Sequence, residues 1–570
     1  MKKIIFAIII MTGLFNSCSK DSYVILPKGQ ASLATLENKV GVNKLLIGVY
    51  ACADGTINGD AGQAWASTVS NWVWGSVASD DARKGASVGD QGDINPIEFF
   101  YVNASNGYVN SHWRTYYDAV RRANDLLGIL KNTKDMTDEE KKQVEAEDRF
   151  LRAHFYFQLT IVHGKVPYID EDTENPGIIP NDHLVYPEME ADMKFAADNL
   201  PDRQTDKGRV TKWAAKTYLA RIYMFQQKFA DAMPLLRDVY TNGRFSLMPS
   251  YEQNYRIKNN NNAESIWEIQ YAVNDGFDGS PNANYGDGLA KPLGTAQVGG
   301  AGNFFNATHS LVSAFRVTPQ GLPLFTTYSV GDIVPWSTDG LDVPYKSPVD
   351  PRLDWTVGRP GVPFLDYGVV QKGVDITAWI WNLLDMGPYP LFVKTMFLKS
   401  ETGFATTTGW MTGLSANNLR LFRLGTVILW LAECEAEVGS LSNATSLVNE
   451  IRNRVKNSNV VRFDDGTPAA NYLVEPYKVD FPTQEYARNA IHMELRLEFG
   501  MEGMRFFDLV RWGIAAEVIN NYMNVEGTIM PLLNGRSFSK GQSEIWPIPQ
   551  QQIDLSMKDG KSVLVQNPGY

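Results

Sequence analysis

The sequence predicts a mainly α-helical fold, in which tetratricopeptide-like helix hairpins form a scaffold beside a large, irregular, loop-rich part with few short strands. Three observations predict it. Apolar residues recur at steps of three and four between residues 113 and 162, and small residues recur at hairpin spacing in two later segments. Glycine, proline and aromatic residues accumulate between residues 243 and 420, where helical periodicity is scarce.

The composition is that of a globular protein with a large core. Of its 570 residues, 44% are hydrophobic and 21% are charged, so the chain does not resemble a disordered segment. Its 53 Lys and Arg residues are outnumbered by 64 Asp and Glu residues, which gives a formal net charge of −11. We therefore expect no nucleic-acid partner, because binding to phosphates needs a basic surface.

The N-terminus has the order of a secretory signal. Two lysines precede an apolar run at residues 4–11, and Ser17 stands directly before Cys18. The run is too short to cross a bilayer. The pattern resembles the lipobox of bacterial lipoproteins, although Phe15 stands where that motif usually has leucine. The resemblance implies that residues 1–17 are a signal peptide and that Cys18 carries lipid; an ordinary signal peptide with an incidental cysteine is the alternative.

Two long helices and two helix hairpins are predicted along the chain. Residues 113–130 and 150–162 carry apolar side chains at helical spacing and predict two buried helices. Residues 213–240 and 424–455 each predict a helix hairpin, since small residues lie where paired helices approach closely. Because these hairpins are far apart in the chain, we do not expect a plain solenoid.

The domain boundaries follow the change in composition at residues 243–420. Loops held on a rigid scaffold commonly carry binding function, so this insertion is the expected ligand-binding part. We place an N-terminal helical region at 18–242 and a C-terminal region at 421–570, and expect 18–570 to form one compact unit.

Five segments in order carry a family resemblance. They are EAEDRFLRAHFYFQLTIVHGKVPYI (145–169), GRVTKWAAKTYLARIYM (208–224), RLFRLGTVILWLAECEAEV (420–438), ELRLEFGMEGMRFFDLVRWG (494–513), and the ending IWPIPQQQI (545–553) with QNPGY (566–570). Together they resemble the SusD/RagB family of outer-membrane nutrient-binding lipoproteins, over nearly the whole chain after the signal.

The resemblance implies a function. Such proteins sit on the cell surface, anchored to the outer membrane by lipid, over a SusC-like TonB-dependent transporter. They capture an oligosaccharide or, in some members, a peptide before import. We therefore expect binding without catalysis and no cofactor. A surface glycan-degrading enzyme and a repeat-based adaptor for protein assembly are the alternatives.

The candidate ligand contacts are aromatic and planar polar side chains. Binding of a pyranose needs an aromatic face together with amides, carboxylates or guanidinium groups for the hydroxyls. Residues 65–83 offer this mixture, and the resemblance adds aromatic residues from the irregular middle. The candidates are Trp72, Trp74, Asp80, Asp81, Arg83, Tyr285, Trp336 and Trp355. The expected ligand is a neutral or weakly charged glycan.

Catalytic and metal motifs are fragmentary. Gly85, Ser87 and Gly89 match G-x-S-x-G, but the strand and helix of a nucleophile elbow are not predicted around them. The adjacent Asp80 and Asp81 would point apart on a strand, which does not suit two carboxylates converging on a glycosidic bond. We therefore predict no catalytic residue.

Neither a zinc cluster nor an EF-hand is present in the sequence. We therefore predict no metal site, although a structural calcium at the polar loop of residues 90–95 is left open.

Two alternatives remain for Cys52 and Cys434. They could pair in an oxidising compartment or remain buried thiols.

Asp508 stands at helical i, i+3 spacing from both Arg505 and Arg511, which predicts partly buried ion pairs with a structural role.

Overall fold

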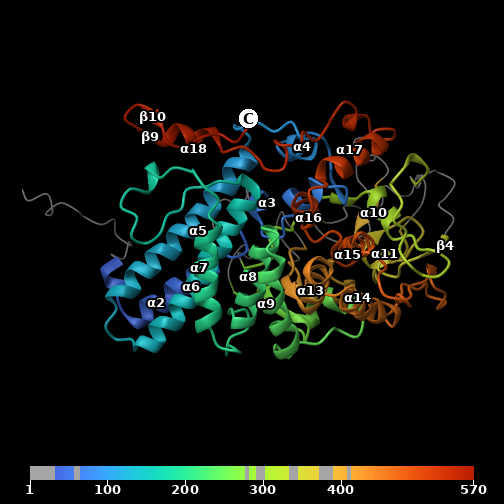
Figure 1. The fold of residues 1–570 in the computed structure, drawn as a ribbon, viewed down its shortest axis with the longest axis horizontal. Coiled ribbons are helices and arrows are strands. Elements are labelled where there is room, and N and C mark those ends of the chain that lie inside the picture. Colours follow the sequence, from blue (N-terminus) through green and yellow to red (C-terminus); the bar gives the residue numbers. More distant parts are fainter. Residues whose placement is uncertain are drawn as a thin grey trace, which may run out of the picture.

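The structure is a computed structural model that describes residues 33–56, 64–276, 282–290, 302–332, 345–370, 389–406 and 413–570 (Figure 1). Within these residues the fold is mainly helical with few short strands, which confirms the predicted fold class. No helix of the described residues is long and apolar enough to cross a bilayer. Cys18 lies outside the described ranges.

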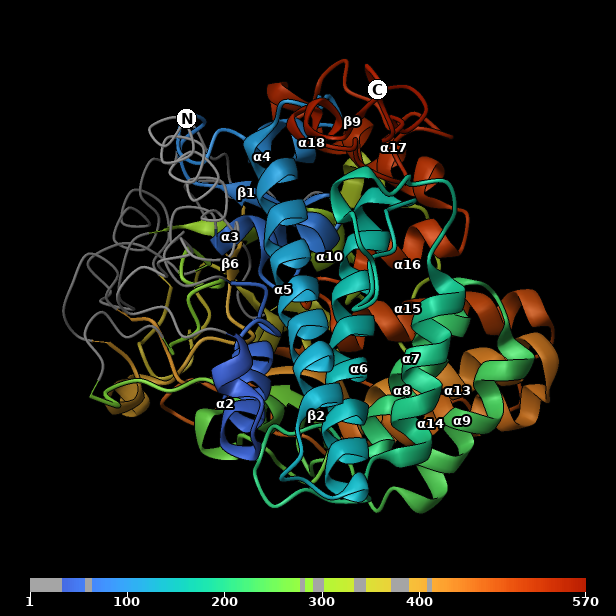
Figure 2. The same ribbon diagram turned by 90° about the vertical axis from the view of Figure 1, so that its left-hand side faces the viewer.

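Two long helices form the N-terminal half of the scaffold. Helix α5 (Gly107–Asn132) begins where the Asn106 side chain accepts hydrogen bonds from two free backbone N–H groups of the first turn. Helix α6 (Asp138–His163) begins with a capping box between Thr137 and Glu140. The second half of α6 is buried on every side, which explains its continuous run of aromatic residues. Helices α5 and α6 lie side by side, with α2 (Lys39–Tyr50) against α5 (Figure 2).

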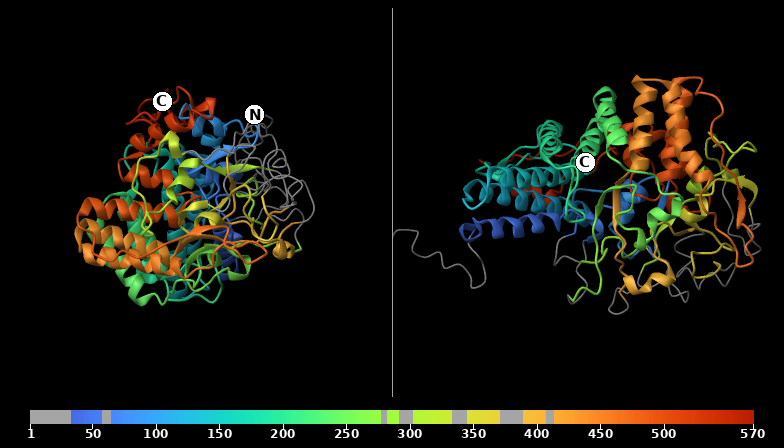
Figure 3. Two further views of the ribbon diagram at one scale, coloured as in Figure 1. Left: turned by 90° about the vertical axis from the view of Figure 1, so that its right-hand side faces the viewer. Right: turned by 90° about the horizontal axis from the view of Figure 1, so that it is seen from below.

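The scaffold continues as a row of packed helices. Each helix contacts the next in the order α5, α6, α7, α8, α9, α13 and α14, and α13 also contacts α15. The hairpins predicted from small residues are α8 with α9 and α13 with α14, and α9 packs directly against α13 although the whole loop-rich part separates them in the chain (Figure 3). The bounds are α7 Tyr186–Asn199, α8 Lys212–Phe225, α9 Phe229–Asn242, α13 Leu424–Val438, α14 Leu441–Lys456 and α15 Gln484–Phe499.

Short helices join these elements. They are α3 (Ala64–Ser67), the π-helical segment η4 (Trp72–Val77), α4 (Ile94–Glu98), α10 (His309–Ala314), α11 (Leu353–Thr356), α16 (Arg505–Arg511), α17 (Ala515–Glu526) and α18 (Gln550–Leu555).

Among the described residues the strands form only two-stranded pairs. Four pairs are antiparallel and one, β4 with β8, is parallel. The pairs are β1 (Ala82–Gly85) with β3 (Phe304–Ala307), β2 (Ser265–Ile269) with β7 (Leu419–Arg423), β4 (Tyr345–Val349) with β8 (Ala470–Tyr472), β5 (Val357–Gly358) with β6 (Leu391–Phe392), and β9 (Met557–Lys558) with β10 (Lys561–Ser562). Strands β2 and β7 therefore tie the start of the loop-rich part to its end.

One continuous hydrophobic cluster runs from Val42 to Leu564 and includes residues of all three predicted regions. For example, Phe150 of α6 meets Trp267 of β2 edge to face at 4.8 Å, and Phe422 of β7 packs on Tyr218 of α8. The division at residues 243 and 421 itself stays a prediction.

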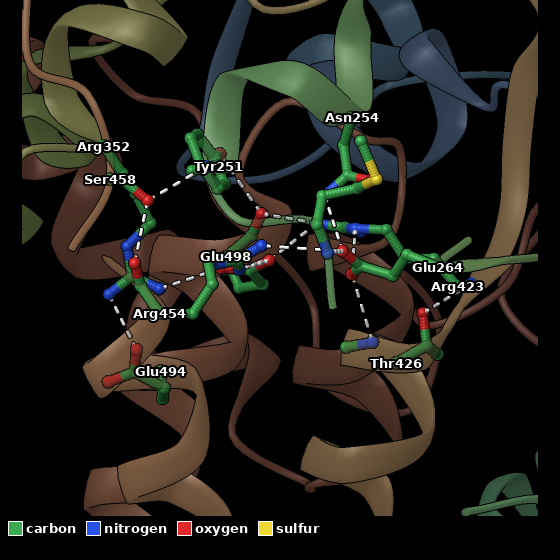
Figure 4. A network of polar contacts seen from close by, with 12 residues as sticks. Tyr251, Asn254, Glu264, Arg352, Arg423, Thr426, Arg454, Ser458, Glu494 and Glu498 are labelled. Atoms are coloured by element: carbon green, nitrogen blue, oxygen red, sulfur yellow. Dashed lines mark hydrogen bonds and ion pairs between the residues drawn. The ribbon is translucent and has the colours of Figure 1, made fainter. Parts of the chain in front are cut away.

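A buried ion network joins α15 to the loop-rich part (Figure 4). Glu498 of α15 contacts the guanidinium groups of Arg352 at 3.0 Å and Arg423 at 3.1 Å, and also pairs with Arg454. Glu264 lies on the other side of Arg423 and Arg454. Since all five side chains are buried, the segment ELRLEFGMEG has a structural role at this position.

One of the two ion pairs predicted around Asp508 is present. Asp508 and Arg511 are 2.7 Å apart, as expected. Arg505 instead pairs with Asp80 at 2.9 Å, so its predicted partner was wrong. Cys52 and Cys434 are both buried free thiols.

Candidate functional site

The two tryptophans predicted as a ligand platform lie in the core. Trp72 is 2% exposed and donates from its indole N–H to the carbonyl oxygen of Gly286 at 3.2 Å. Trp74 is 1% exposed, donates to Ala66 at 2.7 Å and meets Trp546 edge to face at 5.1 Å. The π-helical segment turns both rings inward, so neither presents a face to solvent. In this structure both rings have a packing role, and ligand contact by either of them stays a prediction.

The charged residues that follow are also interior. Asp80 and Asp81 both contact the guanidinium group of Arg496, each at 2.8 Å. They lie in the turn before β1 rather than on a strand, and this is why their carboxylates converge instead of pointing apart. Burial alone would raise the pKa of Asp80, but Arg496 and Arg505 hold it at about 2.

Arg83 pairs with Glu98 and lies over the ring of Tyr389 at 4.8 Å. The charges of Asp80, Asp81 and Arg83 are thus paired inside the protein, and the ligand roles expected of these residues stay a prediction.

The aromatic candidates of the loop-rich part are less uniform. Tyr285 is half-buried and packs against the core. Trp355 is partly exposed, donates to the carbonyl oxygen of Asn459 at 2.9 Å and packs against a small buried cluster that includes Val461. Trp336 lies outside the described residues. Ligand contact by these three residues stays a prediction.

A cleft of about 480 Å³ is lined by aromatic and planar polar side chains, which are the types expected at a glycan site. It lies where the loop after α2, the turn before α8 and the end of β2 meet. We call it the Tyr271 cleft and define it by Tyr50, Asp54, Arg209, Gln270, Tyr271 and Asn282.

Local structure positions these groups. The antiparallel pairing of β2 with β7 buries Glu268, whereas Gln270, which follows directly after the last residue of the strand, is exposed. The Asn418 amide donates to both side chains at 2.9 Å and so fixes Gln270. Gly208 has a φ of +86° and lies so close to Gln270 that a Cβ would collide with its side chain.

Buried polar partners fix the hydroxyl group of Tyr50 at one side of the cleft. The Tyr50 hydroxyl donates to Glu147 at 2.6 Å and accepts from the backbone N–H of Val210 at 3.0 Å. Arg209 pairs with Glu147 at 3.2 Å and lies 5.9 Å from the Tyr50 ring centre. Tyr271 is half-buried beside them. The Tyr50 side of the cleft is thus held in place by buried polar contacts.

Asp54 supplies an acceptor at the same place. Its two carboxylate oxygens accept from the backbone N–H of Thr56 at 2.7 Å and from the Thr56 hydroxyl at 2.6 Å. Burial raises the pKa of Asp54 to about 6, and the hydrogen bonds from Thr56 oppose this shift. Tyrosine rings, planar amides and a carboxylate in one concave site are suited to a ligand rich in hydroxyl groups.

A larger groove of about 830 Å³ lies between α5, residues 167–179 and α18. Within it, Asp118 pairs with Arg121 and Arg122, Glu171 pairs with Arg152, and Asp170 accepts from the Thr173 hydroxyl at 2.6 Å. An interior cavity of about 80 Å³ around Arg221 is too small for a sugar ring. We take the Tyr271 cleft as the candidate site because an aromatic ring, an exposed amide and a carboxylate meet there. No group of three potential metal-ligating side chains was found among the described residues.

The sequence pattern missed this cleft because its residues come from four distant segments. The one local signal is the planar amide of Gln270 next to the aromatic ring of Tyr271, directly after an apolar strand-like segment.

Comparisons with known proteins match the chain along most of its length. Residues 263–570 match the model described as "SusD family", and residues 32–224 match the model described as "Starch-binding associating with outer membrane". The chain is 25% identical over 489 residues to the starch-binding protein SusD of Bacteroides thetaiotaomicron, covering 81% of this chain and 79% of that protein. It is 23% identical over 439 residues to the SusD-like protein P25 of Formosa agariphila, covering 74% and 73%.

Two solved structures share the fold. A laminarin binding SusD-like protein superposes with a TM-score of 0.66 at 23% identity, covering 94% of this chain and all of that chain (100%). The surface glycan-binding protein A of Bacteroides thetaiotaomicron, solved in complex with laminarihexaose, gives a TM-score of 0.66 at 20% identity, covering 93% and 99%.

Proposed function

This chain belongs to the SusD family, and from this we propose that it is a cell-surface lipoprotein that captures an oligosaccharide or polysaccharide fragment and delivers it to a TonB-dependent outer-membrane transporter. The observation that carries the proposal is the ordered match of two family models over residues 32–224 and 263–570. A relative with the same fold was solved with laminarihexaose, which makes β-glucans the first ligands to test.

The Tyr271 cleft is the proposed capture site. It combines the half-buried ring of Tyr271 with the outward amide of Gln270 and the clamped carboxylate of Asp54. A sugar ring packs its C–H face on an aromatic side chain, while amides and carboxylates take its hydroxyl groups. None of these contacts requires a catalytic group, and we propose that the protein binds without cleaving.

The binding experiment is a native gel cast with one polysaccharide per gel. Laminarin, starch, xylan, mannan, alginate and polygalacturonate form the panel, and the same mixtures are assayed for released sugar. The variants are Tyr271→Ala, with Tyr240→Ala as the matched control, since Tyr240 is an exposed tyrosine on α9 away from the cleft. Retardation by one polysaccharide that Tyr271→Ala loses and Tyr240→Ala keeps is the expected result.

Other outcomes separate the alternatives. Released sugar would show an enzyme. If no polysaccharide retards the protein, a peptide ligand becomes the better proposal, because the Asp54 carboxylate is also an acceptor for an ammonium group.

Membrane attachment is proposed to run through Cys18. Expression of the full chain and of Cys18→Ser in a Gram-negative host, followed by separation of membranes, tests it. The wild-type protein is expected in the outer-membrane fraction, and Cys18→Ser outside it. Equal membrane retention of both proteins would contradict lipid anchoring at this residue.

A further inference from the structure

The acids of the Tyr271 cleft differ in how their charge is satisfied. Glu268 pairs with Arg420 at 3.3 Å, and Asp206 pairs with Arg209 at 3.2 Å. Among the described residues, no lysine or arginine forms an ion pair with Asp54. The half-buried carboxylate of Asp54 is therefore a fixed negative charge in the wall of the cleft.

Thr56 sets what this carboxylate can still bind. Its backbone N–H occupies one carboxylate oxygen and its hydroxyl occupies the other, at 2.7 and 2.6 Å. Each oxygen can accept two hydrogen bonds, so one acceptor position remains on each. The clamp also fixes the plane of the carboxylate, which lowers the entropy cost of ligand binding.

We infer that Asp54 makes the cleft select uncharged glycans, which offer it two hydroxyl donors, over glycans that carry carboxylate or sulfate groups. This inference rests on the proposed function. A partly desolvated acceptor left without a donor is costly, and a second anion beside it is costlier, because the effective dielectric constant there is below that of water.

The cations of the cleft do not reverse this preference. Arg209 is engaged by Glu147 and Asp206. Lys207 lies at the rim and is exposed, so solvent and salt screen its charge.

The test compares Asp54→Asn with Asp198→Asn, which removes the same charge from an exposed aspartate on α7 outside the cleft. The probes are the neutral polysaccharide that retards the wild type most strongly in the gel panel, a carboxymethylated preparation of that polysaccharide, alginate and polygalacturonate. Affinities are measured by titration calorimetry at low salt.

Wild type is expected to prefer the neutral probe over its carboxymethylated form by about tenfold or more. Asp54→Asn is expected to weaken binding of the neutral probe by about tenfold and to reduce the preference for it over the carboxymethylated form, while Asp198→Asn changes neither quantity by more than about twofold. Thermal unfolding of each variant shows whether it is folded. A local effect of Asp54 also predicts that the wild type loses its preference for the neutral probe at pH values where Asp54 is protonated.

Two results would overturn the inference while leaving glycan capture in place: wild-type protein that binds alginate or polygalacturonate as tightly as the neutral probe, or an Asp54→Asn variant with the wild-type ratio. Failure of every polysaccharide to bind would instead count against the proposed function itself.

Discussion

Arg352 and Glu498 form an ion pair of 3.0 Å between Nη1 and Oε2, although neither side chain has any exposure to solvent. Arg352 comes from the loop-rich part and Glu498 from α15, so this contact joins the two parts at the centre of the buried network of Figure 4. Arg423 and Arg454 approach the same carboxylate. Three guanidinium groups around one glutamate stabilise its ionised form, which holds the pKa of Glu498 far below its usual value against the opposing effect of burial.

Glu498→Gln is therefore expected to destabilise the protein strongly. The change leaves three buried guanidinium groups without the charge they share, and breaking a buried pair in this way costs about 3–5 kcal/mol. Urea denaturation followed by tryptophan fluorescence measures the loss. The matched control is Glu485→Gln, an exposed glutamate at the start of the same helix, for which less than about 1 kcal/mol is expected. Equal midpoints for the two variants would contradict the structural role of the network.

Two buried carboxylates with lowered pKa values, Asp80 and Glu498, predict instability in acid. In the folded protein Asp80 has a pKa of about 2, and the pKa of Glu498 is also far below its usual value. In the unfolded chain both carboxyl groups titrate near about pH 4. Between about pH 2 and pH 4 the unfolded state binds more protons, so the stability that these carboxylates contribute is present above this range and is lost as the pH falls through it.

The measurement is the denaturation midpoint across this range for the wild type and for Glu498→Gln. The variant is expected to show the shallower fall. Asp54 and Asp148 have raised pKa values, so they lower the stability of the folded state as the pH rises. For this reason the contribution of Glu498 is measured as the difference between the wild type and Glu498→Gln. Parallel curves would show that Glu498 does not contribute to acid sensitivity.

Local patterns predicted the helices but not their arrangement. The spacing from Trp113 to Leu130 predicted α5, and the small residues at 424–455 predicted the hairpin of α13 and α14. Periodicity describes one face of one helix, so it could not show that α13 packs on α9 across the long insertion. The partner of Arg505 was missed for a similar reason, since Asp508 is close in sequence and Asp80 is close only in space.

The candidate site was harder to predict than the fold. Trp72 and Trp74 beside Asp80, Asp81 and Arg83 have the composition of a sugar platform, and the same composition suits a core in which every charge is paired. Burial decides between the two, and no local pattern reports it for a π-helical segment. The Tyr271 cleft depends on contacts between segments up to about two hundred residues apart, such as Asp54 with Tyr271.

Trp72→Ala is expected to destabilise the protein. The indole packs against Phe304 and Phe305 with ring centres 6.2 and 5.7 Å away, and its removal leaves a cavity and an unsatisfied carbonyl at Gly286. A loss of about 3–5 kcal/mol is typical of such truncations. Trp355→Ala, at a partly exposed indole, is the control and is expected to lose less. Wild-type stability together with a selective loss of glycan binding in Trp72→Ala would restore Trp72 as a ligand contact.

Glycan binding is expected to depend on pH through Asp54. Its pKa of about 6 means that the carboxylate loses its charge as the pH falls from about 7.5 to about 5, and a neutral carboxyl group accepts hydrogen bonds more weakly. The titratable groups that face it are Tyr116, Tyr271 and the thiol of Cys52. Burial raises their pKa values, so none of them titrates in this range.

Affinity for the neutral polysaccharide is therefore expected to fall severalfold over this pH interval in the wild type and to stay constant in Asp54→Asn. Calorimetry in one buffer series measures both proteins. A wild-type affinity that does not change between these pH values would place the ligand away from Asp54.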